Sequence, residues 1–178
     1  VDDIMDFSGN INPLPISKSI KDYIYEHFEE ITHYPDREYT MLRGDIAHYL
    51  DISPDMIIVG NGATELIFLT VSSLNIKRAL IPSPTYGEYE RAVKLHQGHI
   101  DIVRIKEEKD FRIEPELLMD RLKEGRADTL ILCNPNNPTG RIIPYNDLIK
   151  ILNYCRESNI NVILDETFVE FAPDMKNV

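Results

Sequence analysis

The chain has 178 residues, of which 43% are hydrophobic and 28% are charged, and its net charge is −11. These values are typical of one globular domain of medium size, which buries roughly 70% of its unfolded surface. The acidic balance argues against a nucleic-acid or anionic-membrane partner, and no apolar run approaches the roughly 20 residues of a membrane helix.

The first residues, VDDIMDF, lack the basic and apolar regions of a secretory signal. Cys133 and Cys155 lie in a strand-like and a helix-like context and fit reduced thiols better than a disulfide. These features indicate a cytoplasmic protein. No Cys/His group has the spacing of a zinc site, so no metal is expected.

Residues 1–16 are rich in turn formers and predict irregular backbone. Ser17 can cap a helix that extends to about His27, with apolar residues on one face. Pro35 interrupts this pattern, and a second helix is expected from about Tyr39 to Leu50.

From residue 51 onward, short apolar strands alternate with amphipathic helices. Strands are expected at residues 56–59, 78–81, 99–105, 129–133 and 161–165. Helices are expected from Ala63 to about Leu74, up to about Leu95, from Pro115 to about Leu122 and from Pro144 to about Arg156. This alternation predicts an α/β fold with a mostly parallel sheet and helices on both faces. Ligands of such sheets bind outside the carboxyl ends of the strands, so the loops after Val59, Ile81, Cys133 and Leu164 should line one site.

The first of these loops, GNGATE, can form an anion cradle. Glycine permits a tight turn with exposed amides, the following helix presents its positive end, and Thr64 adds a hydroxyl. An ordinary glycine turn, in which Asn61 or Thr64 caps the helix, is the alternative. The loop lacks the third glycine of the dinucleotide fingerprint and the Gly-Lys-Ser/Thr of a Walker motif, so it supports neither NAD nor ATP.

The second loop, PSPTYGEY, places Tyr86 just past a strand end. Its ring can stack on a flat ligand. The alternative is that Tyr86 and Tyr89 only pack.

The third and fourth loops carry Asn137, within NPNNPTG, and Asp165, at the end of an apolar strand. Prolines present the amide of Asn137 rigidly, and a carboxylate in this position needs a cation or donors. The two residues are 28 positions apart, close to the roughly 30 residues of a strand–helix–strand unit, so on adjacent strands they can hold opposite edges of one aromatic ring. Pyridoxal 5′-phosphate offers an oxyanion, a protonated ring nitrogen, a phosphate and a flat face to the four loops.

NPNNPTG followed by ILDETF resembles the fold-type I, class I/II aminotransferase family of pyridoxal phosphate enzymes, and the resemblance covers the whole chain. It implies that Asn137 binds the 3-hydroxyl oxygen of the cofactor and Asp165 its pyridine nitrogen. It also implies cofactor contacts by Gly62, Ala63, Thr64 and Tyr86, and by Tyr34 on the partner subunit.

The family is generally dimeric, so the resemblance implies a homodimer. Residues 1–50 are then an N-terminal arm and helices of the small domain or dimer interface, and residues 51–178 an incomplete, N-terminal part of the large cofactor-binding domain. In this chemistry the ring is an electron sink. Loss of C–H at the substrate's α-carbon leads to transamination, and loss of C–COO⁻ leads to decarboxylation.

Two branches of the family compete. Histidinol-phosphate aminotransferases show Asn-Glu-Asn-Pro near the start and Asp-Glu-Ala-Tyr after the last strand. Here residues 10–13 read NINP and residues 165–168 read DETF, which resemble the threonine-phosphate decarboxylases of cobalamin synthesis, although Pro15 replaces their usual glycine. A phosphorylated amino acid or amine is the implied substrate, with Asn10 or Asn12 near it.

The family's Schiff-base lysine normally lies about thirty residues past the aspartate, and Lys176 is too close to be that lysine. The carboxylate-binding arginine and the glycine-rich segment that precedes DFS are also expected elsewhere. We therefore expect the chain alone to be inactive. A non-catalytic sensor module with the same fold, or an α/β domain without a cofactor, are the alternatives of another class.

Overall fold

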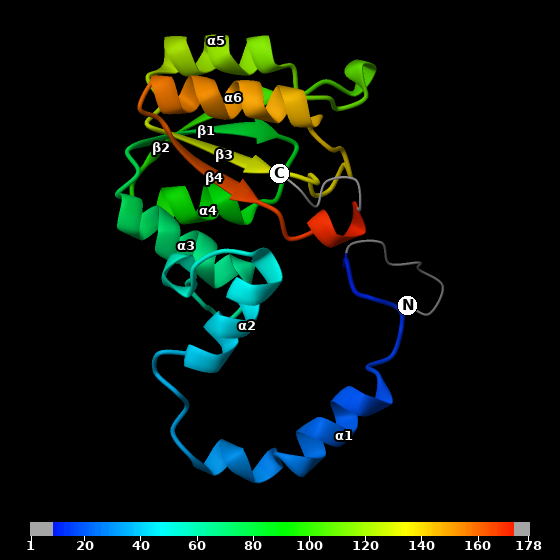
Figure 1. Ribbon diagram of the computed structural model, residues 1–178. Coiled ribbons are helices and arrows are strands. Elements are labelled where there is room, and N and C mark those ends of the chain that lie inside the picture. Colours follow the sequence, from blue (N-terminus) through cyan, green and yellow to red (C-terminus); the bar gives the residue numbers. More distant parts are fainter. Residues whose placement is uncertain (1–8, 173–178) are drawn as a thin grey trace. The chain divides into compact units, whose positions relative to one another are not determined.

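The computed structural model describes residues 9–172 (Figure 1). The chain divides into two compact units, of which the first ends at Ile58 and the second begins at Val59. The VDDIMDF start and Lys176, to which the sequence predictions referred, lie outside the described residues.

The first unit is helical. It contains α1 (Lys18–Glu26), the 3₁₀ turn η1 (Phe28–Thr32), α2 (Thr40–Leu50) and the 3₁₀ turn η2 (Pro54–Met56). Both helices agree with the sequence pattern, and the Ser17 hydroxyl accepts a hydrogen bond from Ile20 N–H at 3.4 Å, as expected of an N-cap. No residue of α1 is buried, so packing inside this unit does not cover its apolar residues.

The second unit is a parallel sheet between two layers of helices (Figure 1). Its strands are β1 (Arg78–Ser83), β2 (His99–Arg104), β3 (Thr129–Cys133) and β4 (Asn161–Asp165), in the order β2-β1-β3-β4. Its helices are α3 (Ala63–Leu74), α4 (Glu88–Leu95), α5 (Pro115–Gly125) and α6 (Tyr145–Glu157), with the 3₁₀ turns η3 (Glu107–Lys109) and η4 (Val169–Phe171). Every strand pair is parallel, which confirms the predicted α/β class.

The core of this unit lies on both faces of the sheet. Leu80 and Leu130 point toward α5 and α6, whereas Ala79 and Ile131 pack with α3 and α4. Strands buried on both faces need continuous apolar runs, because their side chains alternate between the faces. The runs at residues 78–81 and 129–133 are therefore explained by the two helix layers.

The strand predicted at residues 56–59 was wrong. Met56 ends η2, and the backbone at Ile57 is extended (φ −114°, ψ 128°) but belongs to no strand of the described sheet. Ile58 is 78% exposed. An apolar run can adopt extended geometry, but it forms a strand only where a neighbouring strand accepts its hydrogen bonds.

No helix within residues 9–172 is both long and apolar enough to cross a membrane. The division of the chain into residues 1–50 and 51–178, with a role for the first part in a small domain or dimer interface, stays a prediction.

Candidate functional site

The turn after β3 is closed by its own backbone. Asn136 N–H donates to the Arg141 carbonyl at 2.8 Å, and Gly140 N–H donates to the Asn136 carbonyl at 2.7 Å. Gly140 has φ +66°, a conformation that glycine adopts readily. The Asn134 amide also donates to the Asp165 carbonyl at 2.8 Å, which joins the start of this turn to the end of β4.

The Asn136 side chain joins two loops. Its Nδ2 donates to the Pro84 carbonyl at 3.0 Å and to the Thr139 hydroxyl at 2.8 Å. Its Oδ1 accepts from the Thr85 hydroxyl at 2.7 Å. These bonds connect the loop after β1 to the turn after β3. Sequence reasoning missed this role, which no spacing between the two segments indicates.

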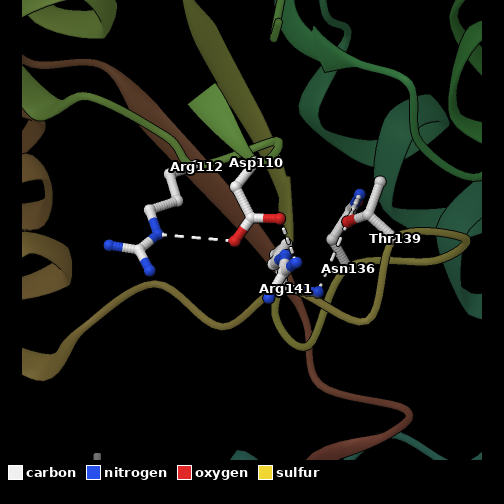
Figure 2. Close-up of polar contacts among 5 residues, drawn as sticks. All are labelled: Asp110, Arg112, Asn136, Thr139 and Arg141. Carbon is white, nitrogen blue, oxygen red and sulfur yellow. Dashed lines mark hydrogen bonds and ion pairs between the residues drawn. The ribbon is translucent and has the colours of Figure 1, made fainter. Parts of the chain in front are cut away.

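The turn is also braced from the β2–α5 connection (Figure 2). Arg141 forms an ion pair with Asp110, whose other carboxylate oxygen lies 3.9 Å from Arg112 Nε. All three groups are about half exposed or more, so solvent weakens these pairs. These ion pairs contact the exposed side of the turn, whereas the hydrogen bonds of Asn136 stabilise its buried side.

Asn137 is the residue of the turn whose side chain stays available. It is half-buried, and its side-chain amide makes no hydrogen bond to any residue in the described range 9–172. Cys133, at the end of β3, lies opposite Asp165 at the end of β4. The turn that carries Asn137 therefore follows the strand next to the one that ends at Asp165, as the sequence predicted.

Asp165 is held by donors on both carboxylate oxygens. Its Oδ1 accepts from Thr167 N–H at 2.9 Å and from the Thr167 hydroxyl at 2.6 Å, and its Oδ2 accepts from the Tyr89 hydroxyl at 2.6 Å. Burial, and then the bond to Asp165, raise the pKa of Tyr89 far above its ordinary value. Tyr89 is therefore a hydrogen-bond donor at any working pH.

The sequence indicates no role for Thr167, and for Tyr89 it indicates only packing beside Tyr86. The available signal for Tyr89 was its position three residues after Tyr86, close to the same strand end. It does pack, with its ring edge against Tyr86 at 5.6 Å between centroids and an interplanar angle of 80°. The structure adds the polar contact at its far end.

Tyr86 reaches the loop before α3. Its hydroxyl lies 3.1 Å from the Thr64 hydroxyl. Gly62, with φ +84°, precedes α3, and no side chain caps the helix, so the alternative in which Asn61 or Thr64 is the cap is wrong. The Glu65 carboxylate accepts from Asn61 N–H. The positive end available to an anion therefore consists of the first amides of α3, near Ala63, and the Thr64 hydroxyl.

The remaining predicted residues belong to the first unit. Asn10 and Asn12 are exposed, and Asn12 Oδ1 accepts from Leu14 N–H at 2.9 Å. Tyr34 is fully exposed. Thr64, Tyr86, Asn137 and Asp165 all belong to the second unit. The roles of Asn10, Asn12 and Tyr34 stay separate predictions.

The chain has relatives among known proteins. The model of the family "Aminotransferase class I and II" matches residues 2–178. Threonine-phosphate decarboxylase of Salmonella typhimurium is 36% identical over 173 residues, which are 97% of this chain and 47% of that protein. A protein of Caldanaerobacter subterraneus subsp. tengcongensis, to which the same activity is ascribed provisionally, is 42% identical over 170 residues, or 94% of this chain and 45% of that protein.

Solved structures agree with this result. The histidinol-phosphate aminotransferase of Clostridium acetobutylicum has a TM-score of 0.86 and 35% identity, covering 98% of this chain and 51% of that chain. That of Sinorhizobium meliloti, solved in complex with pyridoxal 5′-phosphate, has a TM-score of 0.80 and 25% identity, covering 90% and 43%. The chain spans about half the length of the curated relatives it matches. It belongs to the aminotransferase class I and II family, which matches it from residue 2 to residue 178.

Proposed function

We propose that the protein is a cytoplasmic, pyridoxal-phosphate-dependent L-threonine O-3-phosphate decarboxylase of cobalamin synthesis. The observation that carries the enzyme class is the pair of groups at neighbouring strand ends: the available amide of Asn137 after β3 and the carboxylate of Asp165 on β4. The choice of reaction is supported by the relatives named for this decarboxylase and by the DETF sequence at residues 165–168.

The donors and acceptors present fit the cofactor. Asp165 would hold the pyridine nitrogen, Asn137 the 3-hydroxyl oxygen, and Tyr86 a ring face. Thr64 and the first amides of α3, at Ala63, would hold the phosphate, because that end of the helix has no side-chain cap. When bound, pyridoxal phosphate supplies an electron sink for the breaking bond at the substrate's α-carbon.

The chain's own residues prepare this site. The hydrogen bonds from Tyr89 and Thr167 hold the Asp165 carboxylate in one place, where it would accept a hydrogen bond from a protonated ring nitrogen. Asn137 would donate to the neighbouring oxygen without help from residue 168, because Phe168 has no hydroxyl. Pro135 and Pro138 fix the backbone that presents Asn137.

Other parts of the proposal concern the first unit and the partner. We propose a homodimer in which Tyr34 reaches the cofactor phosphate of the partner subunit, and in which Asn10 or Asn12 lies near a phosphorylated substrate. The full exposure of Tyr34 is compatible with such a contact.

Histidinol-phosphate aminotransferase is the second candidate, and its structural likeness at a TM-score of 0.86 favours it. The test is to supply the full-length protein with threonine phosphate and measure carbon dioxide, and in parallel with histidinol phosphate and 2-oxoglutarate and measure glutamate. We expect carbon dioxide, and its loss in Asp165→Asn. Glutamate without carbon dioxide would replace the first proposal by the second.

A further inference from the structure

Tyr89 joins the core of the second unit to the candidate site. It lies in the first turn of α4 and is completely buried. Its ring belongs to the cluster that contains Ile131 and Cys133 of β3, with Ile163 of β4 packed against it. From the face of the sheet that α3 and α4 cover, the Tyr89 hydroxyl donates to Asp165 Oδ2 at 2.6 Å, although the two residues are 76 positions apart.

The hydrogen bonds distinguish the two oxygens of Asp165. A carboxylate oxygen accepts about two hydrogen bonds. Oδ1 already has two donors, the amide and the hydroxyl of Thr167. Among residues 9–172, Oδ2 has one donor, the Tyr89 hydroxyl, so Oδ2 keeps room for one more.

We propose that Tyr89 is a positioning residue that, with Thr167, fixes the Asp165 carboxylate so that Oδ2 accepts a hydrogen bond from the protonated ring nitrogen of the cofactor. This inference rests on the proposed function, because it concerns the contact between Asp165 and pyridoxal phosphate.

Packing alone does not explain why residue 89 carries a hydroxyl. A phenylalanine would fill the same apolar space without burying a polar oxygen, and an oxygen buried without a partner is costly. The carboxylate likewise needs donors at the end of an apolar strand. Together the two groups fix one orientation of the carboxylate before the cofactor binds, which lowers the cost of binding.

The test uses four variants of the full-length protein: Tyr89→Phe, Asp165→Asn, the double variant, and Tyr154→Phe as control. Tyr154 is a half-buried tyrosine packed against the cluster on the opposite face of the sheet, and it is outside the proposed site. The dissociation constant of pyridoxal phosphate is measured by absorbance, and the thermal unfolding midpoint is measured without cofactor.

We expect Tyr89→Phe to weaken cofactor binding roughly tenfold, the effect of one hydrogen bond to a charged group. Tyr154→Phe should bind as the wild type does. In the Asp165→Asn background, Tyr89→Phe should add nothing to the loss, because Tyr89 acts through that carboxylate. A purely structural role would instead give additive losses.

Replacement of Tyr89 by 3-fluorotyrosine is the second measurement, because it keeps the size and strengthens the donor. It should change the absorption spectrum of the bound cofactor while the unfolding midpoint stays. Wild-type affinity in Tyr89→Phe, or additive losses in the double variant, would overturn the inference. Failure of the wild type to bind pyridoxal phosphate would refute the proposed function itself. The wild-type titration therefore distinguishes failure of the proposed function from failure of the role of Tyr89.

Discussion

The substitution Asn136→Ala tests whether one buried amide holds the turn that presents Asn137. The change removes the bonds to the Pro84 carbonyl and to the hydroxyls of Thr85 and Thr139. At about 1 kcal/mol for each of these three bonds, the free energy of unfolding should fall by about 3 kcal/mol. Only 9% of Asn136 is exposed, so water replaces these partners poorly.

The assay is urea denaturation of the full-length protein without cofactor, followed by a titration with pyridoxal phosphate. The matched control is Asn153→Ala on an exposed position of α6, which should change stability by less than about 0.5 kcal/mol. Asn136→Asp is the sharper variant, because it keeps acceptors for the hydroxyls of Thr85 and Thr139 but places an acceptor against the Pro84 carbonyl. If Asn136→Ala and Asn136→Asp both unfold at the same urea concentration as the wild type, Asn136 does not hold the loop after β1 to the turn after β3.

Three further predictions concern the rest of the fold. Burial raises the pKa of the Cys155 thiol from 9.0 to about 11, so the folded state retains this proton longer than the unfolded state. The associated stability is intact below about pH 9 and is lost as the pH rises to 11. The free energy of unfolding, measured by urea denaturation at several pH values, should fall by about 2–3 kcal/mol less between pH 9 and pH 11 in Cys155→Ala than in the wild type. The same fall in both proteins would contradict a raised pKa at Cys155. Gly98→Ala would place a Cβ 2.8 Å from Val93 Cγ1 and 2.9 Å from the Ile76 carbonyl, so it should cost about 1–3 kcal/mol in the same measurement. Gly44 lies inside α2, and apart from its neighbours and the backbone of its own helix no atom of the described residues lies within 4 Å of an added Cβ. Gly44→Ala should therefore raise stability by about 0.5–1 kcal/mol, and equal effects at the two glycines would refute this prediction.

The sequence by itself determined the local elements and the positions of the loops at the strand ends. Strands β3 and β4 have the predicted bounds, at residues 129–133 and 161–165, and α3 begins and ends where its pattern does, at residues 63–74. Apolar periodicity, prolines and glycines are local signals, and they act over a few residues. The spacing between NPNNPTG and Asp165 also predicted correctly that β3 and β4 are neighbours.

Only the tertiary structure decided which distant residues meet. The contact between Tyr89 and Asp165 depends on the strand order β2-β1-β3-β4, which places α4 below β3 with β4 next to it. The failure of residues 56–59 to form a strand has the same origin, because a strand needs a partner that its own sequence does not specify. Strand order and pairing arise from packing the whole chain, so the residues that orient Asp165 became visible only in three dimensions.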